Sequence, residues 1–144
     1  MFDRSFVAGL QEAAKRQLWL DFEQMPKELE AGSLVIAEEL ISTLTPVPLR
    51  GRPDAVYLNN KGWLVPVETK VRSRAVVRLR DIVQLSVYRV MLERGGWGDR
   101  YDATIAPYGY VRLVVHGRPR YCRVPLFDQV LIVMLWAAYW RCRA

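Results

Sequence analysis

The hydrophobic pattern of the central part of the chain predicts a β-hairpin followed by a helix. Two apolar segments, 54–59 and 63–72, are separated by residues 60–62, whose Asn-Lys-Gly sequence favours a tight loop between strands. From residue 76 to residue 94 the apolar positions recur with helical spacing, and the Gly-Gly pair at 95–96 is a strong stop signal. We therefore expect strands at 54–59 and 63–72 and a helix at 76–94.

The same pattern predicts further elements on both sides of this unit. They are helices at 4–20 and 26–44, strands at 47–51 and 103–106, a hairpin of 110–116 with 120–124 around Gly117, and a helix after Pro125. The apolar run 130–140 in that last helix has eleven residues, short of the roughly 20 that a membrane span requires, so we expect no membrane partner. We expect this helix to be apolar all round because it is buried in the core or because it meets a partner subunit in a homo-oligomer.

Three charged residues lie in the predicted hairpin. Asp54 begins the first strand, and Glu68 and Lys70 follow the apolar stretch 63–67 of the second. Charged residues are disfavoured in an apolar strand unless they are paired or bind a metal. The triplet therefore indicates either a cross-strand salt bridge or a metal site suited to phosphodiester cleavage.

The length of the loop decides which of these residues face one another. If residues 60–62 form a three-residue loop with Gly62 in the left-handed conformation, Asp54 falls directly opposite Glu68. Directly opposed residues have Cβ atoms about 4.5–5.5 Å apart, close enough for one divalent cation to bind both carboxylates. A two-residue loop would turn Asp54 away from Glu68, because a slip of one residue moves every side chain to the other face. Gly62 favours the first register.

This register predicts a compact set of metal ligands. Asp54 and Glu68 supply anionic oxygens for Mg²⁺ or Mn²⁺, and the backbone carbonyl of Thr69 is the expected third ligand. Lys70 shares a face with Glu68 and can orient the attacking water, stabilise transition-state charge or act as a base, and the residues leave these roles open. Glu38, at the border of the apolar stripe of the predicted 26–44 helix, is the candidate for an extra acidic ligand or else a solvated helix charge.

Residues 53–54 (Pro-Asp) followed by 68–70 (Glu-Thr-Lys) resemble the signature of the PD-(D/E)xK nuclease superfamily. The wider sequence, which includes a Gln-x-x-x-Tyr element at 84–88, is similar to the RecB-like branch and most similar to the CRISPR-associated RecB-like exonucleases. The resemblance covers about residues 47–94. It implies an α/β fold with a restriction-endonuclease-like αβββαβ core, in which helices flank a mixed β-sheet.

The resemblance also implies roles for individual residues. In that family the residues that match Asp54 and Glu68 bind metal, the match of Lys70 is catalytic, and the matches of Gln84 and Tyr88 help to form the site or hold DNA. We expect one nuclease domain over residues 1–144, with its core at about 27–124 and additional N-terminal and C-terminal helices.

The cysteines depart from that family. Its CRISPR-associated members typically carry four cysteines that ligate an iron–sulfur cluster, whereas this chain has only Cys122 and Cys142. Two thiolates cannot supply the four ligands, so we expect no iron–sulfur cluster. Whether these two residues form a disulfide is left open by the sequence.

Charge and composition agree with a nucleic-acid partner. The net charge is +6 and the isoelectric point is near 9.6, a balance suited to phosphate backbones. Continued strand alternation keeps Arg72 and Arg74 on the face of Glu68 and Lys70, so we expect both arginines to contact DNA. The N-terminus lacks a basic region followed by an apolar one, which predicts a cytoplasmic protein.

The sequence therefore predicts a Mg²⁺- or Mn²⁺-dependent deoxyribonuclease, of the RecB-like exonuclease kind, that acts on single-stranded or double-stranded DNA. A structure-selective endonuclease of the junction-resolvase kind shares the Pro-Asp and Glu-x-Lys elements. A non-catalytic DNA-binding or assembly subunit on the same fold is the alternative from outside the enzyme class.

Overall fold

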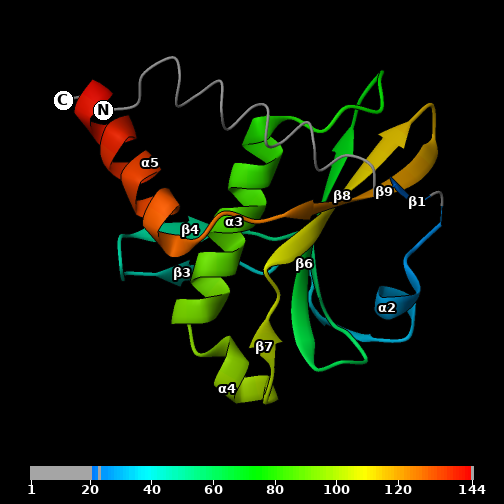
Figure 1. The fold of residues 1–144 in the computed structure, drawn as a ribbon, viewed down its shortest axis with the longest axis horizontal. Coiled ribbons are helices and arrows are strands. Elements are labelled where there is room, and N and C mark those ends of the chain that lie inside the picture. Colours follow the sequence, from blue (N-terminus) through cyan, green and yellow to red (C-terminus); the bar gives the residue numbers. More distant parts are fainter. Residues whose placement is uncertain (1–20, 23, 144) are drawn as a thin grey trace.

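The computed structural model describes residues 21–22 and 24–143, and the predicted helix at 4–20 lies outside them. A mixed sheet forms the centre of the described part, with α3 and α5 on one side and the one-turn helix α2 on the other (Figure 1). In chain order the elements are β1 (Asp21–Phe22), α2 (Lys27–Glu30), β2 (Ser33–Ile36), β3 (Ile41–Thr43), β4 (Leu49–Gly51), β5 (Ala55–Leu58), β6 (Trp63–Val71), α3 (Leu79–Arg94), α4 (Trp97–Tyr101), β7 (Thr104–Ile105), β8 (Tyr108–Val115), β9 (Arg118–Pro125) and α5 (Gln129–Arg143).

The main sheet has the strand order β1-β9-β8-β6-β5-β2, and β7 also pairs with β6. Strand β6 runs parallel to β8, and the crossover between them includes α3, whereas β5 and β6 form an antiparallel hairpin. Parallel strands require such a crossover connection, so α3 is held against the sheet beside β6. The predicted mixed α/β fold, a sheet flanked by helices, is confirmed.

The β5–β6 hairpin has the register that the three-residue loop predicts. The strands pair from Ala55 opposite Val67 to the loop, where the N–H of Asn59 donates to the carbonyl of Trp63 at 2.8 Å. Gly62 has a φ of +80°, in the left-handed region that glycine adopts without steric cost. The face of every side chain on both strands follows from this pairing.

Two apolar clusters cover the two faces of the sheet. Alternate residues of β6 point to opposite faces, so Leu64 packs under α3 with Ile82 and Leu85, while Val65 packs with Leu29 of α2. Glu68 is an even number of residues from Leu64 and therefore projects toward α3. The helix that bounds the core on this face also bounds the predicted site.

The predicted helix at 26–44 is wrong beyond its first turn. The chain forms α2, then β2 pairs with β5, and β3 pairs with β4 in a separate two-stranded sheet. A Cβ on Gly32 would overlap the carbonyl oxygen of Leu58, so the chain comes directly against the end of β5 here. Pairing with that open strand edge outweighs the weak local preference for a helix.

The C-terminal helix α5 is only partly buried. Ile132 is in the core, whereas Val130 and Trp140 are 66% and 53% exposed. Burial in the core therefore does not explain its apolar sequence, and contact with a partner subunit stays a prediction. Among the described residues, no helix is long and apolar enough to cross a bilayer.

We predict that Gly62→Ala lowers the free energy of unfolding by about 1–2 kcal/mol, because a left-handed conformation strains any residue with a Cβ. No atom lies within 4 Å of the position that this Cβ would take, so strain alone is measured. Asn60→Ala, in the same loop and without a positive φ, is the control. Urea unfolding that gives equal stabilities for the two variants would contradict the loop geometry.

Candidate functional site

The two carboxylates predicted to share a site do face one another across the hairpin. Asp54 immediately precedes Ala55, so the observed register carries it to the position opposite Glu68. Its Oδ2 accepts a hydrogen bond of 2.7 Å from the backbone N–H of Thr69. Glu68 is 6% exposed on the α3 face of β6. The hairpin thus brings one anchored and one buried carboxylate together.

Pro53 leaves the end of the ladder incomplete. One step beyond Asp54, the same register places Pro53 opposite Thr69. Proline has no N–H, so it cannot donate the ladder hydrogen bond to the carbonyl of Thr69. The N–H of Thr69 is satisfied by Asp54 instead, and the carbonyl of Pro53 accepts from Glu38 at 3.0 Å. The carbonyl of Thr69 therefore receives no ladder bond from this side, next to the two carboxylates.

Helix α3 completes the wall of the site. The side-chain amide of Gln84 donates to Oε1 of Glu68 at 3.0 Å and to the hydroxyl of Tyr88 at 2.9 Å. The hydroxyl of Tyr88 donates in turn to the carbonyl of Arg52 at 3.3 Å. Gln84 and Tyr88 are one helical turn apart and lie on one stripe of α3. Both predicted residues therefore reach the site and orient Glu68.

The electrostatic state of Glu68 fits a cation site. Burial and then the neighbouring Asp54 carboxylate raise the pKa of Glu68 from 4.5 to about 7, although Lys70 opposes the shift. Its Oε2 is buried and has no hydrogen-bond partner among the described residues. The Nζ of Lys70 lies 4.0 Å from the other oxygen, Oε1. A divalent cation between Asp54 and Glu68 would supply the missing contact and remove the repulsion between the carboxylates.

Glu38 does not complete this pair as a third acidic ligand. It lies in the loop after β2, with a φ of 55° and an exposed position, because the predicted 26–44 helix is absent. Its backbone N–H binds the carbonyl of Pro53, so only its main chain is tied to this region. No three Asp, Glu, His or Cys side chains among the described residues form a group able to hold a metal ion.

Arg72, which was predicted to contact DNA, forms an ion pair with Asp81 within the protein. Its guanidinium binds both carboxylate oxygens of Asp81, one contact being 2.7 Å from Nη2 to Oδ1, and also donates to the carbonyl of Val76 at 2.9 Å. Asp81 is fully buried and accepts a further bond of 2.8 Å from the N–H of Arg78. Burial opposes its ionisation, but these hydrogen bonds outweigh that effect, so the pKa of Asp81 lies below its usual value.

Sequence reasoning missed Asp81. The available signal was its position three residues after Arg78, where an acidic side chain often binds the backbone at the start of a helix. Arg74, by contrast, is exposed and lines a hollow beyond the end of β6, and its contact with DNA stays a prediction.

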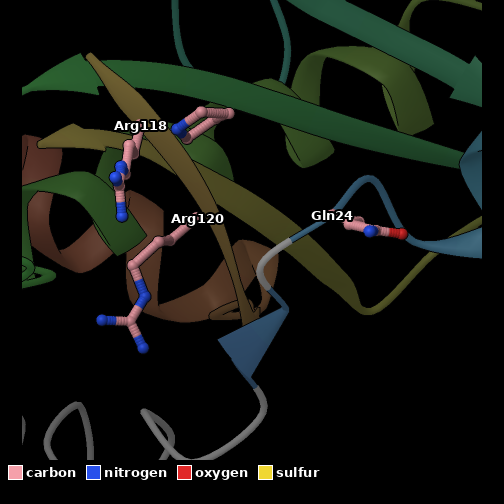
Figure 2. A pocket seen from close by; sticks show the side chains of 4 residues that line it. Gln24, Arg118 and Arg120 are labelled. Carbon is pink, nitrogen blue, oxygen red and sulfur yellow. The ribbon is translucent and has the colours of Figure 1, made fainter.

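A second basic hollow lies away from these residues, on the β8–β9 hairpin. Its volume is about 420 Å³, and it is lined by Gln24, Arg118, Pro119 and Arg120. Figure 2 shows the side chains that line it. Its lining contains none of the predicted metal or DNA ligands, so we place the candidate site at the β5–β6 hairpin.

Comparison with known proteins shows a likeness to solved structures. No protein-family model matches the sequence, and no curated protein matches it significantly. The structure is similar to the crystal structure of SSO0001, with a TM-score of 0.51 and 16% sequence identity over 76% of this chain and 50% of that one. The chain therefore spans about half the length of that neighbour, and the likeness shows the fold alone.

We predict that the metal-free protein loses stability as pH rises from about 4.5 through about 7, because the folded state holds the Glu68 proton more tightly than the unfolded chain. The shift corresponds to a loss of about 3 kcal/mol once Glu68 is ionised. Glu68→Gln should remove this loss, whereas Glu30→Gln, at an exposed position of α2, should leave it in place. Urea unfolding in EDTA measures this change in the free energy of unfolding from about pH 5 to about pH 8, roughly the window that the pKa shift sets. If the free energy of unfolding varied with pH in the same way for wild type and Glu68→Gln, the buried state of Glu68 would be contradicted.

We predict that Arg72→Gln lowers the free energy of unfolding by about 3–5 kcal/mol, because it leaves the buried Asp81 carboxylate without its cation. The double variant Arg72→Gln/Asp81→Asn should recover part of the loss. Arg74→Gln, on an exposed neighbour, should change stability by less than about 0.5 kcal/mol. Equal effects of Arg72→Gln and Arg74→Gln in thermal or urea unfolding would show that the pair does not stabilise the fold.

Proposed function

We propose that this chain is a metal-dependent deoxyribonuclease that hydrolyses phosphodiester bonds of DNA. The observation that carries the proposal is the pair Asp54 and Glu68, opposed on adjacent strands, with one buried carboxylate oxygen that lacks a hydrogen-bond partner among the described residues. Like charges held this close are costly unless a cation joins them.

The expected ligands of Mg²⁺ or Mn²⁺ are the carboxylates of Asp54 and Glu68 and the backbone carbonyl of Thr69. All are oxygen donors, which these ions prefer. Pro53 supports the third ligand because it provides no N–H to that carbonyl. A bound ion would lower the pKa of water and neutralise charge on the scissile phosphate.

The remaining residues of the site can position the reacting groups and neutralise negative charge. Lys70 has its ammonium 4.0 Å from Glu68 and a side chain 29% exposed, so it can reach a water or a phosphate oxygen beside the carboxylates. Gln84 holds Glu68 in place, and Tyr88 holds Gln84. This arrangement supports a role for Lys70 in orienting the attacking water, stabilising transition-state charge or acting as a base, and a role for Gln84 and Tyr88 in orienting a ligand.

The resemblance to RecB-like nucleases supports an exonuclease acting on single-stranded or double-stranded DNA. The presence of only two cysteines, where an iron–sulfur cluster requires four ligands, supports an enzyme without such a cluster. One observation favours the non-catalytic alternative, a DNA-binding or assembly subunit: the described residues provide only two grouped acidic ligands. Two carboxylates with a backbone carbonyl still provide three protein oxygens, so we retain the enzyme as the leading function.

We predict that Lys70→Ala and Asp54→Asn each lower divalent-metal-dependent cleavage of labelled DNA by about 100-fold or more, because each removes a group at the reacting phosphate. Lys61→Ala, exposed in the loop of the same hairpin, is the matched control and should cleave like the wild type. Linear, circular and four-way-junction DNA are each incubated with Mg²⁺, Mn²⁺ or EDTA, and thermal unfolding verifies that every variant is folded.

Cleavage that survives both substitutions would overturn the site. Cleavage of junctions without attack on free ends would favour the structure-selective endonuclease. DNA binding with no cleavage in either metal would favour the non-catalytic subunit.

A further inference from the structure

A basic hollow lies directly beyond the catalytic end of β6. Its volume is about 510 Å³, and its lining consists of Val71, Arg72, Ser73, Arg74, Val76, Arg78 and Arg80. Four of these seven residues are arginines and none is acidic. The hollow begins at the residue after Lys70, so the strand that carries the proposed site also forms one wall of the hollow.

The Arg72–Asp81 pair gives this hollow a fixed shape. It joins the end of β6 to the first turn of α3, and the bond from Arg72 to the carbonyl of Val76 holds the loop between them. The guanidinium of Arg72 is thereby engaged within the protein. Three exposed arginines carry the charge that a ligand would meet: Arg74 and Arg78 in this loop and Arg80 in the first turn of α3.

Helix α3 links the hollow to the carboxylates. Arg80 lies four residues before Gln84, so the two share a stripe of the helix and are about 6 Å apart along its axis. Gln84 in turn binds Glu68 at 3.0 Å. The hollow is therefore one helical turn from the proposed site of cleavage, a separation suited to neighbouring phosphates on one strand.

We propose that Arg74, Arg78 and Arg80 bind the backbone of the DNA strand next to the scissile phosphate. This inference rests on the proposed function and names the part of the substrate that the enzyme holds. Guanidinium groups bind phosphates through paired hydrogen bonds, and contacts to phosphate carry no sequence information. The bound strand must extend past the cleaved bond on the α3 side, and binding there must be independent of base sequence and sensitive to salt.

The test measures DNA binding in EDTA, where no metal-dependent cleavage competes. Fluorescence anisotropy of a labelled single-stranded oligonucleotide gives Kd from about 50 to about 200 mM KCl, and the slope of log Kd against log salt counts the phosphate contacts. The variant Arg74→Gln/Arg78→Gln/Arg80→Gln should lower the magnitude of the slope by about two and weaken binding at least about tenfold at low salt.

A second triple variant controls for charge. Arg94→Gln/Arg100→Gln/Arg141→Gln removes the same three charges from exposed positions on the far end of α3, on α4 and on α5. Its slope should differ from that of the wild type by less than about one. Equal changes in the two triple variants would overturn the inference, because general basicity would then explain binding.

Two further outcomes separate this inference from the proposed function. If the wild type cleaves DNA and both triple variants bind and cleave alike, the proposed nuclease function is supported and the inference about the arginine hollow is overturned. If the wild type does not cleave DNA in Mg²⁺ or Mn²⁺, but only the hollow variant shows a smaller slope of log Kd against log salt, the inference about the hollow is supported and the proposed nuclease function is overturned. Inorganic phosphate that displaces DNA from the wild type at matched ionic strength, but not from the hollow variant, would support the inference, because the two ligands would then compete for the same arginines.

Discussion

The register of the β5–β6 hairpin is the constraint on which the site depends. Gly62 closes a three-residue loop because it adopts a φ of +80° without a Cβ penalty. That loop places Asp54 opposite Glu68 and turns both toward α3. A slip of one residue would move Asp54 to the other face and separate the carboxylates. A backbone preference at one residue of the loop thus decides whether the acidic side chains can act together.

The site concentrates electrostatic cost in one buried carboxylate. Burial and then the facing Asp54 carboxylate raise the pKa of Glu68 to about 7. The amide of Gln84 donates one hydrogen bond to this carboxylate. The rest of the hairpin offsets this cost through the apolar residues that flank Glu68 on both faces of β6. Such a local conflict with the rules of stable packing is typical of a functional position.

Two arginines two residues apart illustrate how tertiary contacts separate similar residues. Alternation along β6 predicted that Arg72 and Arg74 would both face the substrate. The start of α3 places the buried Asp81 within reach of Arg72 only, so that guanidinium braces the loop while Arg74 remains exposed. Strand alternation predicts which face of the sheet a side chain lies on, but it does not predict which residue of another element will contact that side chain.

The sequence by itself determined the hairpin, its register and the α3 stripe of Gln84 and Tyr88, because turn chemistry and short-range periodicity are local properties. Only the tertiary structure decided that residues 33–36 form a strand, since the open edge of β5 supplies their hydrogen bonds. It also decided that Asp81 pairs with Arg72 and that the N–H of Thr69 binds the side chain of Asp54 where the ladder ends. Each of these contacts joins residues that are far apart in the sequence, so a local sequence pattern does not predict it.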